Sequence, residues 1–400
     1  MRKILFLAVS LLAVMPLSAA TGALTPNKIV IPDIEGYKTL KGDFHIHTVF
    51  SDASVWPTTR VQEAIWEGLD VLAITEHVDT RHQKMRNNGT FTEKCDRNES
   101  FRIAKKAAGK KLLVVHGGEI TRGMPSGHFN CLFINDNETI CSEAEKTDNT
   151  PDEHIKAMKG GLAEARKQNA FIMWNHPHWH KHAPNETIMW PAHKELLKKG
   201  LMDAIEIYNM ACGYSPEAHE WCLKNNLAML GNSDAHQPFF TELDYLHGDH
   251  RPVTLVFATE KSLEGVREAL DARRSAVFAE GMVYGREQEL APLFKACVKV
   301  KSKKWSDKGV TFVLENKSSI PIILTKASGS EGLWYPRYIV LAPMSSISVK
   351  ARPLLVNHTQ PAFKESQNEA VVNFNVETFQ IGANKALPFS VTVPRKKSVK

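Results

Sequence analysis

DFHIHT, residues 43–48, is the stretch of sequence that decides the fold. Alternate residues of an extended chain face the same side, so His45 and His47 point one way while Phe44 and Ile46 pack behind them. Two neighbouring imidazoles are costly to bury and well suited to hold a metal ion. A lone His-x-His pair more often marks ordinary histidines. Here, however, further His, Asp and Glu clusters follow, each at the end of an apolar run.

Apolar runs and helical segments alternate about seven times along the chain. Residues 69–75 are nearly all apolar, as is typical of a strand buried on both faces, and Glu76 and His77 follow them directly. Such alternation predicts a parallel α/β barrel or a doubly wound sheet. Polar clusters just past the strand ends would share one rim in a barrel, whereas an open sheet would spread them along a crevice. The pattern therefore favours a barrel over residues 21–285.

From about Ala291 the helical periodicity disappears, and β-rich runs separated by turn residues continue to the end of the chain. Residues 310–315, 338–341 and 371–376 are examples. This pattern predicts a small β-sandwich-like domain over residues 291–400. The domain holds no ligand cluster, so we expect a structural role, in packing on the barrel or shaping the cleft rim, rather than carbohydrate binding.

The first 20 residues have the pattern of a secretory signal peptide: a basic start, a short apolar run and small residues at the end. The apolar run is too short for a comfortable membrane span, and a retained anchor is the alternative. We therefore expect an exported protein, periplasmic or extracellular, with no membrane span after cleavage.

Charge and cysteine content narrow the range of partners. The formal net charge is +6, and it becomes +4 when Arg2 and Lys3 leave with the signal peptide. So mild a charge gives no reason to expect a nucleic-acid partner. The 6 cysteines are irregularly spaced, include no Cys-x-x-Cys motif and assign no disulfide pairs. We expect a small-molecule substrate, and the sequence makes no prediction of the oligomeric state.

The candidate metal ligands are nine His, Asp and Glu residues near the ends of predicted strands: His45, His47, Asp52, His77, Glu119, His128, His176, Asp234 and His236. Imidazole nitrogens and carboxylate oxygens suit Zn²⁺, Mn²⁺ or Fe²⁺. Nine ligands are too many for one ion, and a carboxylate such as Glu119 can bridge two ions, as in phosphatases and nucleases. A hydroxide bridging two such ions can attack phosphorus or a carbonyl near neutral pH. Each cluster alone could be an ordinary loop or surface pair. The coincidence of strand end and ligand type across six clusters argues against that reading.

Taken in order, these motifs resemble those of the polymerase-and-histidinol-phosphatase (PHP) family of metal phosphoesterases. The resemblance spans roughly residues 40–280 and rests on His45-x-His47 with Ser51-Asp52, Thr75-Glu76-His77, Gly118-Glu119, His176-Pro177 and Ser233-Asp234-Ala235-His236. With its signal peptide and β-rich tail, the chain is most similar to exported bacterial PHP phosphodiesterases of the Sb-PDE type.

This resemblance implies a distorted (β/α)7 barrel that holds two or three divalent metal ions, Zn, Mn or Fe. It implies a first ion on His45, His47, Glu119 and Asp234, a second on Glu119, His128 and His176, and a third on Asp52, His77 and His236. Glu119, Asp234 and His236 would be the catalytic residues, with Glu119 and Asp234 orienting the metal-bridging hydroxide.

The chain departs from the family pattern at two positions. Members usually have Asp before the second-cluster histidine, where this chain has Glu76; we expect that side chain to stand behind the ligands, so the site should survive the change. His128 and Asn130 share one face of their strand, and spacing permits either to hold the second ion. We choose His128 because imidazole is the better ligand.

A phosphoester also needs donors or cations beside the metals. Loop residues Arg81, His82, His180 and Arg251 are the predicted substrate contacts, although most such loop charges simply face water. We expect a phosphodiesterase. The alternatives are hydrolysis of a phosphomonoester or an amide at the same metals, or a surface binding module whose metal centre only supports the fold.

Overall fold

The computed structural model describes residues 28–79, 96–144, 150–183, 185–356, 359, 361–364 and 366–395. The predicted signal peptide, residues 1–20, and the predicted substrate contacts Arg81 and His82 lie outside these residues. The helices are α1 (Pro57–Glu67), α2 (Glu99–Ala108), α3 (Asn137–Ala144), α4 (Pro151–Lys167), α5 (Pro191–Lys198), α6 (Pro216–Asn225), α7 (Leu263–Asp271) and α8 (Glu287–Cys297), with a 3-10 turn, η3 (Phe239–Thr241). Among the described residues, no helix has both the length and the apolar character that crossing a membrane requires.

The strands of the N-terminal part are β1 (Lys38–Asp43), β2 (Val71–Ile74), β3 (Leu113–Thr121), β4 (His128–Leu132), β5 (Phe171–Trp174), β6 (Ala204–Asn209), β7 (Gly213–Tyr214), β8 (Ala228–Asn232), β9 (Val253–Ala258), β10 (Ser275–Ala279) and β11 (Met282–Gly285). Those of the C-terminal part are β12 (Val298–Ser306), β13 (Gly309–Asn316), β14 (Ile322–Lys326), β15 (Leu333–Trp334), β16 (Tyr338–Leu341), β17 (Ser346–Pro353), β18 (Glu369–Gln380) and β19 (Ala386–Pro394).

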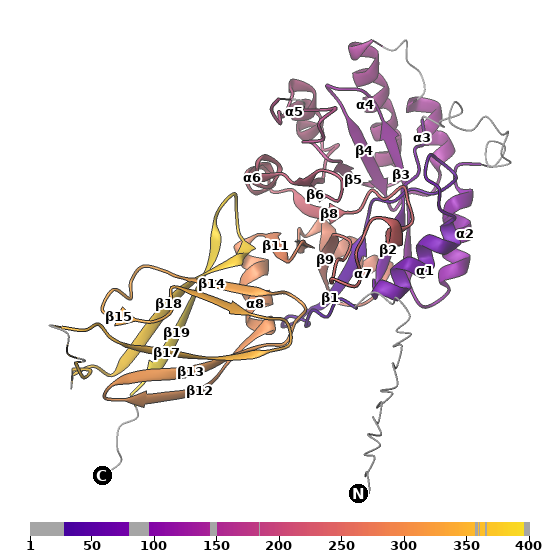
Figure 1. The fold of residues 1–400 in the computed structure, drawn as a ribbon. Helices are drawn as coiled ribbons and strands as arrows, with labels where there is room; N and C mark the ends of the chain where they lie inside the picture. Colours follow the sequence, from indigo (N-terminus) through magenta and orange to yellow (C-terminus); the bar gives the residue numbers. More distant parts are fainter. Residues whose placement is uncertain are drawn as a thin grey trace, which may run out of the picture.

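A mixed α/β sheet with helices packed around it forms the N-terminal part (Figure 1). Strands β1, β2 and β3 pair in parallel, as do β5, β6 and β8. Strand β4 runs antiparallel between β3 and β5, and β9 runs antiparallel to β1. The sheet curves until β8 reaches β1 and β9: Gly231 N–H donates to Thr254 Oγ1 at 3.0 Å, and Ile46 forms a parallel bridge with Ala235. The carboxyl ends of the parallel strands therefore face one space.

Local sequence explains where the helices start. Four of them, α1, α4, α5 and α6, have proline in the first turn, where a missing N–H costs nothing and the fixed φ suits a helix. The side chains of Thr150, Ser215 and Ser262 accept backbone N–H groups as N-caps of α4, α6 and α7.

The stretch that begins at Asp43 is not a strand along its whole length, because β1 ends at Asp43. Side chains replace the strand ladder from there. Phe44 N–H donates to Asn232 Oδ1 at 2.9 Å, and Ile46 N–H donates to Thr75 Oγ1 at 2.9 Å. The histidines thus stand just beyond the strand, where the chain is extended and fully buried.

The C-terminal part begins later than the sequence indicated, because residues 291–297 complete α8. Proline inside that helix, at residue 292, hides the helical pattern. Strands β12, β13, β17 and β15 then form one antiparallel sheet, while β14, β16, β18 and β19 extend the large sheet through a parallel pairing of β18 with β11. The two sheets meet at Phe312 and Phe374, whose ring centroids are 6.5 Å apart.

Arg251 ties three segments together beneath the strand ends. Its guanidinium is fully buried and donates to Glu67 of α1 at 2.7 and 2.8 Å and to Asp43 at 3.1 Å. The same guanidinium lies 3.6 Å from the ring centroid of Phe239. Asp43 in turn accepts the Ser233 hydroxyl at 2.6 Å, next to a predicted ligand. The two buried carboxylates therefore share one arginine as their cation, and the same contacts position the loop before β9.

Replacing Arg251 by Met should lower the free energy of unfolding by about 3–5 kcal/mol, because two buried carboxylates lose their cation. The measurement is chemical denaturation of the purified protein. Lys199→Met is the matched control: it removes an exposed cation 2.9 Å from Glu195, and such surface pairs contribute about 0–1 kcal/mol. Equal stability losses in the two variants would contradict the role given to Arg251.

Candidate metal centre

All nine predicted ligands gather around one cavity of about 540 Å³ at the carboxyl ends of the parallel strands. Loop residues Trp179, Lys181, Ala211 and Cys212 form its outer walls. His45 and His47 are fully buried under its floor. The other seven line it: Asp52, His77, Glu119, His128, His176, Asp234 and His236.

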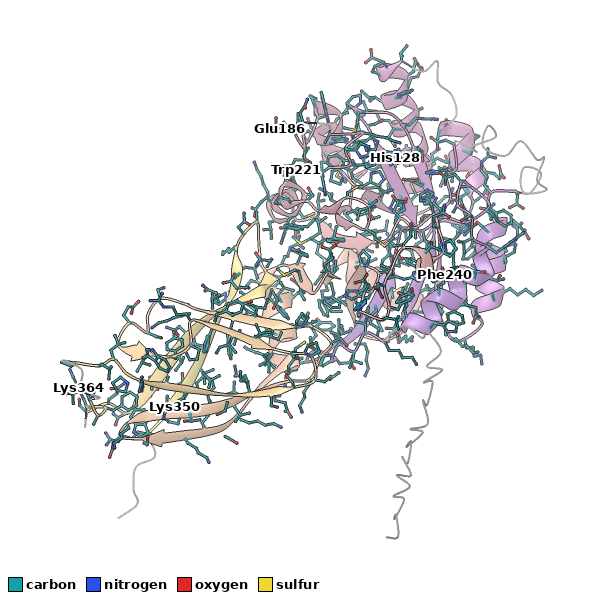
Figure 2. The ribbon with its side chains drawn as sticks, viewed as in Figure 1. His128, Glu186, Trp221, Phe240, Lys350 and Lys364 are labelled. Carbon is teal, nitrogen blue, oxygen red and sulfur yellow. The ribbon has the colours of Figure 1, made fainter. Side chains whose placement is uncertain are left out.

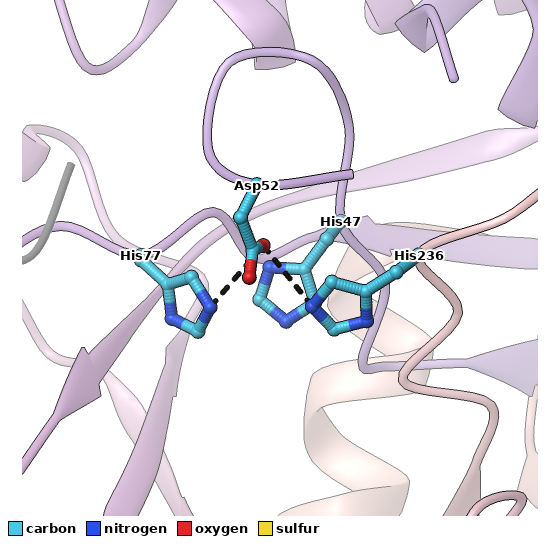
Figure 3. Close-up of side chains that lie close together, drawn as sticks. All are labelled: His47, Asp52, His77 and His236. Carbon is cyan, nitrogen blue, oxygen red and sulfur yellow. Dashed lines mark ion pairs between the residues drawn. The ribbon is translucent and has the colours of Figure 1, made fainter. Parts of the chain in front are cut away.

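One group of possible ligands joins the loop after β1 to the ends of β2 and β8 (Figure 3). Asp52 Oδ1 lies 3.0 Å from His236 Nε2 and 3.4 Å from His77 Nε2. The His47 ring packs against those of His77 and His236, with centroids 4.4 and 4.5 Å away. The ligand atoms of these four residues lie within 4.8 Å of one another, close enough for a single ion.

Two further groups share His45. One joins His45, Glu119 and His176, and the other joins His45, His47 and Asp234. Asp234 Oδ1 is 3.1 Å from Nε2 of both His45 and His47, and a Glu119 oxygen lies 3.5 Å from each of these nitrogens. The two carboxylates therefore stand between the histidines, in the place where a carboxylate can serve two ions.

His128 faces this cavity, and Asn130 does not. His128 Nδ1 is 3.1 Å from Glu119 Oε1. Asn130 is fully buried; its amide donates to the Phe44 carbonyl at 3.1 Å and its oxygen accepts the Asn175 amide at 2.9 Å. The structure thus leaves His128 as the candidate of the two, although it lies outside the three compact groups found among the described residues.

Electrostatics hold the carboxylates in their ionised form. Burial alone would raise the pKa of Asp234, but His45 and His47 lower it far more. Burial likewise opposes ionisation of Glu119, yet His77 and His128 keep its pKa well below the usual range. Burial, with His77 and His236 nearby, lowers the pKa of His47 to about 3, so this imidazole is neutral. Ionised carboxylates and a neutral His47 suit a divalent cation; burial opposes protonation of His45 and His77, but nearby carboxylates raise the pKa of both, so they would release protons when an ion binds.

The backbone at two ligands adopts a conformation that ordinary residues avoid. His176 has φ 28° and Asp234 has φ 53°. Each is held by a specific hydrogen bond: His176 N–H donates to Glu206 Oε2 at 2.9 Å, and Asp234 N–H donates to the His45 carbonyl at 2.7 Å. Strained residues of this kind persist where the surroundings fix them, and they cluster at functional sites.

Glu206 in β6 anchors the ligands from below, and no motif in the sequence points to it. It is 1% exposed. Its Oε1 is 3.1 Å from His45 Nδ1 and accepts the Asn232 amide at 2.9 Å. Its Oε2 accepts the Asn209 amide at 3.1 Å as well as the His176 N–H. A carboxylate on Nδ1 fixes the imidazole tautomer, so that Nε2 of His45 is left for a metal ion.

Glu76, the residue that departs from the family pattern, supports His47 in the same way. Its carboxylate accepts the hydroxyls of Thr48 and Ser51 and the Thr48 N–H at 3.2 Å. Ser51 Oγ lies 3.2 Å from His47 Nδ1. Glu76 therefore acts on the ligand through Ser51 and does not face the cavity, which agrees with the expectation.

The predicted substrate contacts fare differently. The prediction that Arg251 contacts the substrate is wrong, because its guanidinium is fully buried and donates to Asp43 and Glu67. His180 is exposed on the loop after β5 and does not line the cavity. Its neighbours Trp179 and Lys181 do, and the Lys181 ammonium lies 4.7 Å from the Trp179 ring centroid. Loop position alone could not tell which side chains turn inward.

A solved structure of similar sequence and fold comes from Bacteroides vulgatus: a two-domain protein that contains a predicted PHP-like metal-dependent phosphoesterase. It is 39% identical, with a TM-score of 0.81, over 92% of this chain and 98% of that one. A metal-dependent phosphoesterase candidate from Bifidobacterium adolescentis is 16% identical with a TM-score of 0.36, over 49% of this chain and 87% of that one. No protein-family model and no curated protein matches the chain.

Glu206→Gln should raise the dissociation constant for Zn²⁺ or Mn²⁺ by about 10–100-fold, the usual effect of losing a partner behind a ligand. Four donors point at this carboxylate. In the glutamine variant an NH₂ group replaces one oxygen, and it cannot accept the hydrogen bonds that this oxygen accepts. Competition with a chromophoric chelator measures the affinity. Glu206→Asp keeps the charge and should lose less, and the exposed Glu186→Gln should lose nothing. Unchanged affinity in a folded Glu206→Gln protein would refute the role.

Proposed function

We propose that this chain, which belongs to the PHP-like metal-dependent phosphoesterases, is a phosphodiesterase that acts outside the cytoplasm. The family assignment makes it a hydrolase of phosphoester bonds. The observation that carries the diester preference is the lining of the cavity. Among its described residues, Lys181 is the one Lys or Arg side chain, and Trp179 and Ala211 are apolar. A diester has a single negative charge and two organic arms, which suits this lining better than a monoester dianion does.

The residues divide into recognisable roles. Bound divalent ions would polarise the phosphoryl oxygens and lower the pKa of a water molecule. Glu119 and Asp234 would help to hold these ions and would orient the attacking water molecule. The ring of His236 is fixed by the contact of its Nδ1 with the Asp234 carbonyl at 2.8 Å, which leaves Nε2 facing Asp52. At 33% side-chain exposure His236 is the most accessible ligand, so we assign it to the leaving-group side.

Several finer expectations belong to this proposal. We infer a distorted (β/α)7 barrel over residues 21–285, a β-sandwich-like domain after α8, and two or three ions of Zn, Mn or Fe. The curved sheet and the three ligand groups support the barrel and the ion number. The N-terminal sequence pattern supports export to the periplasm or beyond and likeness to the Sb-PDE type. The substrate would be a small-molecule phosphoester, with no nucleic-acid partner.

Turnover of p-nitrophenyl diesters and monoesters by the Zn- or Mn-loaded protein tests the reaction. We expect faster diester cleavage, and loss of more than about 10²-fold in kcat/KM for His45→Ala or Asp234→Ala, at least the effect of removing one transition-state donor. The exposed Asp152→Ala should keep full activity. Faster monoester cleavage would make the protein a phosphatase, and full activity in either ligand variant would refute the assigned centre.

Chelation separates a catalytic centre from a structural one. Removing the metal should abolish turnover while the protein stays folded, because the ion-free ligands already pair with one another. Circular dichroism and a thermal melt of metal-stripped protein make the comparison, and added metal should restore the rate. Loss of fold together with loss of metal would support a structural centre, and with it the reading as a binding module.

A further inference from the structure

The two parts of the chain carry opposite formal charges. Residues 291–400 contain 17 Lys and Arg residues and 6 Asp and Glu residues, a formal net charge of +11. Residues 1–290 contain 33 and 38 of them, a formal net charge of −5. The mild total charge hides this division. A charge asymmetry of this size indicates that the C-terminal part meets an anionic partner.

Three of these cations lie on one face of the sheet β12-β13-β17-β15. Strand register pairs Lys304 with Thr311 and Thr311 with Lys350, so these three side chains form one row on the solvent face. Arg352 lies two residues beyond Lys350 on the same face. Its guanidinium is 4.6 Å from the ring centroid of Trp334, which is 46% exposed. The row therefore leads from lysines to an exposed aromatic ring.

An exposed apolar triplet follows at the end of β17. Leu354, Leu355 and Val356 are 44%, 53% and 61% exposed. The Leu354 N–H donates to the Gly332 carbonyl at 3.0 Å, which places the triplet beside β15. Lys364 lines the same surface cavity as Leu354 and Val356. We call this set, with Lys304 of the row, the distal tip: Lys304, Trp334, Lys350, Arg352, Leu354, Leu355, Val356 and Lys364.

The distal tip lies far from the metal centre. Figure 2 shows Lys350 and Lys364 at the end of the molecule opposite His128. Of the nearby carboxylates, Asp307 already has a cationic partner, an Arg395 nitrogen 3.5 Å away, whereas Glu331 and Glu369 line the same cavity as Lys364. The tip thus presents apolar side chains beside cations, and only Lys364 shares its cavity with acids.

Lysines on an exposed edge strand have an ordinary explanation, because they prevent sheets from pairing edge to edge. That explanation covers β12, but it does not cover exposed aliphatic side chains among the cations. Apolar groups that enter the headgroup region and cations that attract anionic headgroups are together what a peripheral protein needs on a lipid surface. An exposed Trp is also typical of that interface. We propose that the distal tip docks the protein on anionic lipid surfaces.

A polyanion without an apolar phase, such as nucleic acid or an acidic polysaccharide, would bind the lysines. It would offer no apolar environment in which Leu355 and Val356 could be buried. The observations therefore favour the lipid surface. The proposal does not depend on the reaction at the metal centre, and either can fail without the other.

Cosedimentation with vesicles tests the proposal with the full chain lacking residues 1–20. The probes are vesicles of phosphatidylglycerol and phosphatidylcholine in equal parts, and vesicles of phosphatidylcholine alone. We expect binding to the first that weakens as salt rises, and little binding to the second. No binding to the anionic vesicles at low salt, or equal binding to both kinds, would overturn the proposal.

Variants separate the two contributions. Removing three cations in Lys304→Gln/Lys350→Gln/Lys364→Gln should weaken partitioning on the order of 100-fold, at about fivefold per charge. Leu355→Ser/Val356→Ser should weaken it by about 10-fold or more, because two apolar side chains leave the headgroup region. Hydrolysis of a soluble p-nitrophenyl ester should not change in either variant.

Matched substitutions on the N-terminal part complete the design. Phe240, which is 75% exposed, takes the apolar change in Phe240→Ser, and Lys156 on α4 takes the charge change in Lys156→Gln. Both controls should bind vesicles as the parent protein does. Equal losses in controls and tip variants would overturn the proposal. So would binding to heparin or DNA as tight as to vesicles together with full vesicle binding by Leu355→Ser/Val356→Ser.

Discussion

Ionised carboxylates buried among imidazoles are the interaction on which the rest of this structure depends. Glu119 is fully buried and the Asp234 side chain is only 17% exposed, so an unpaired charge on either is more costly than in water. Histidines from several strand ends surround them and keep them ionised. Each charge is stabilised by groups from distant parts of the chain. The positions of the strand ends relative to one another must therefore be accurate. The curved sheet is what brings them together.

The same constraint explains the layer behind the ligands. His45 depends on Glu206, and His47 depends on Glu76 through Ser51. These acids are themselves satisfied by amides, hydroxyls and backbone N–H groups, so no bare charge is left beneath the site. The ligands of such a centre are already in position before an ion binds. Little reorganisation then accompanies binding, which favours tight and geometrically selective coordination.

Much of this could be predicted from the sequence, for physical reasons. Residues such as His77 and His176 combine a ligand side chain with a place directly after an apolar run, and both signals are local. Glu206 sits within such a run, and three of its four partners come from distant positions, so no local pattern reveals its role. Arg251 looks like any loop cation, because its pairing with Asp43 and Glu67 exists only in three dimensions. The end of α8 was missed because proline at residue 292 interrupts its helical pattern.

The position of the C-terminal part bears on which substrates can reach the centre. It is not a loosely attached module: β18 pairs in parallel with β11, and Ala383 N–H at the tip of the β18–β19 hairpin donates to Glu220 of α6 at 2.8 Å. The basic sheet face and the metal centre therefore keep a fixed relation, at opposite ends of the molecule (Figure 2). If the distal tip rests on a lipid surface, the cavity is held away from that surface. Headgroups of the same layer would not reach Lys181 and Trp179 at the cavity wall, so the geometry favours diesters that arrive from the aqueous side.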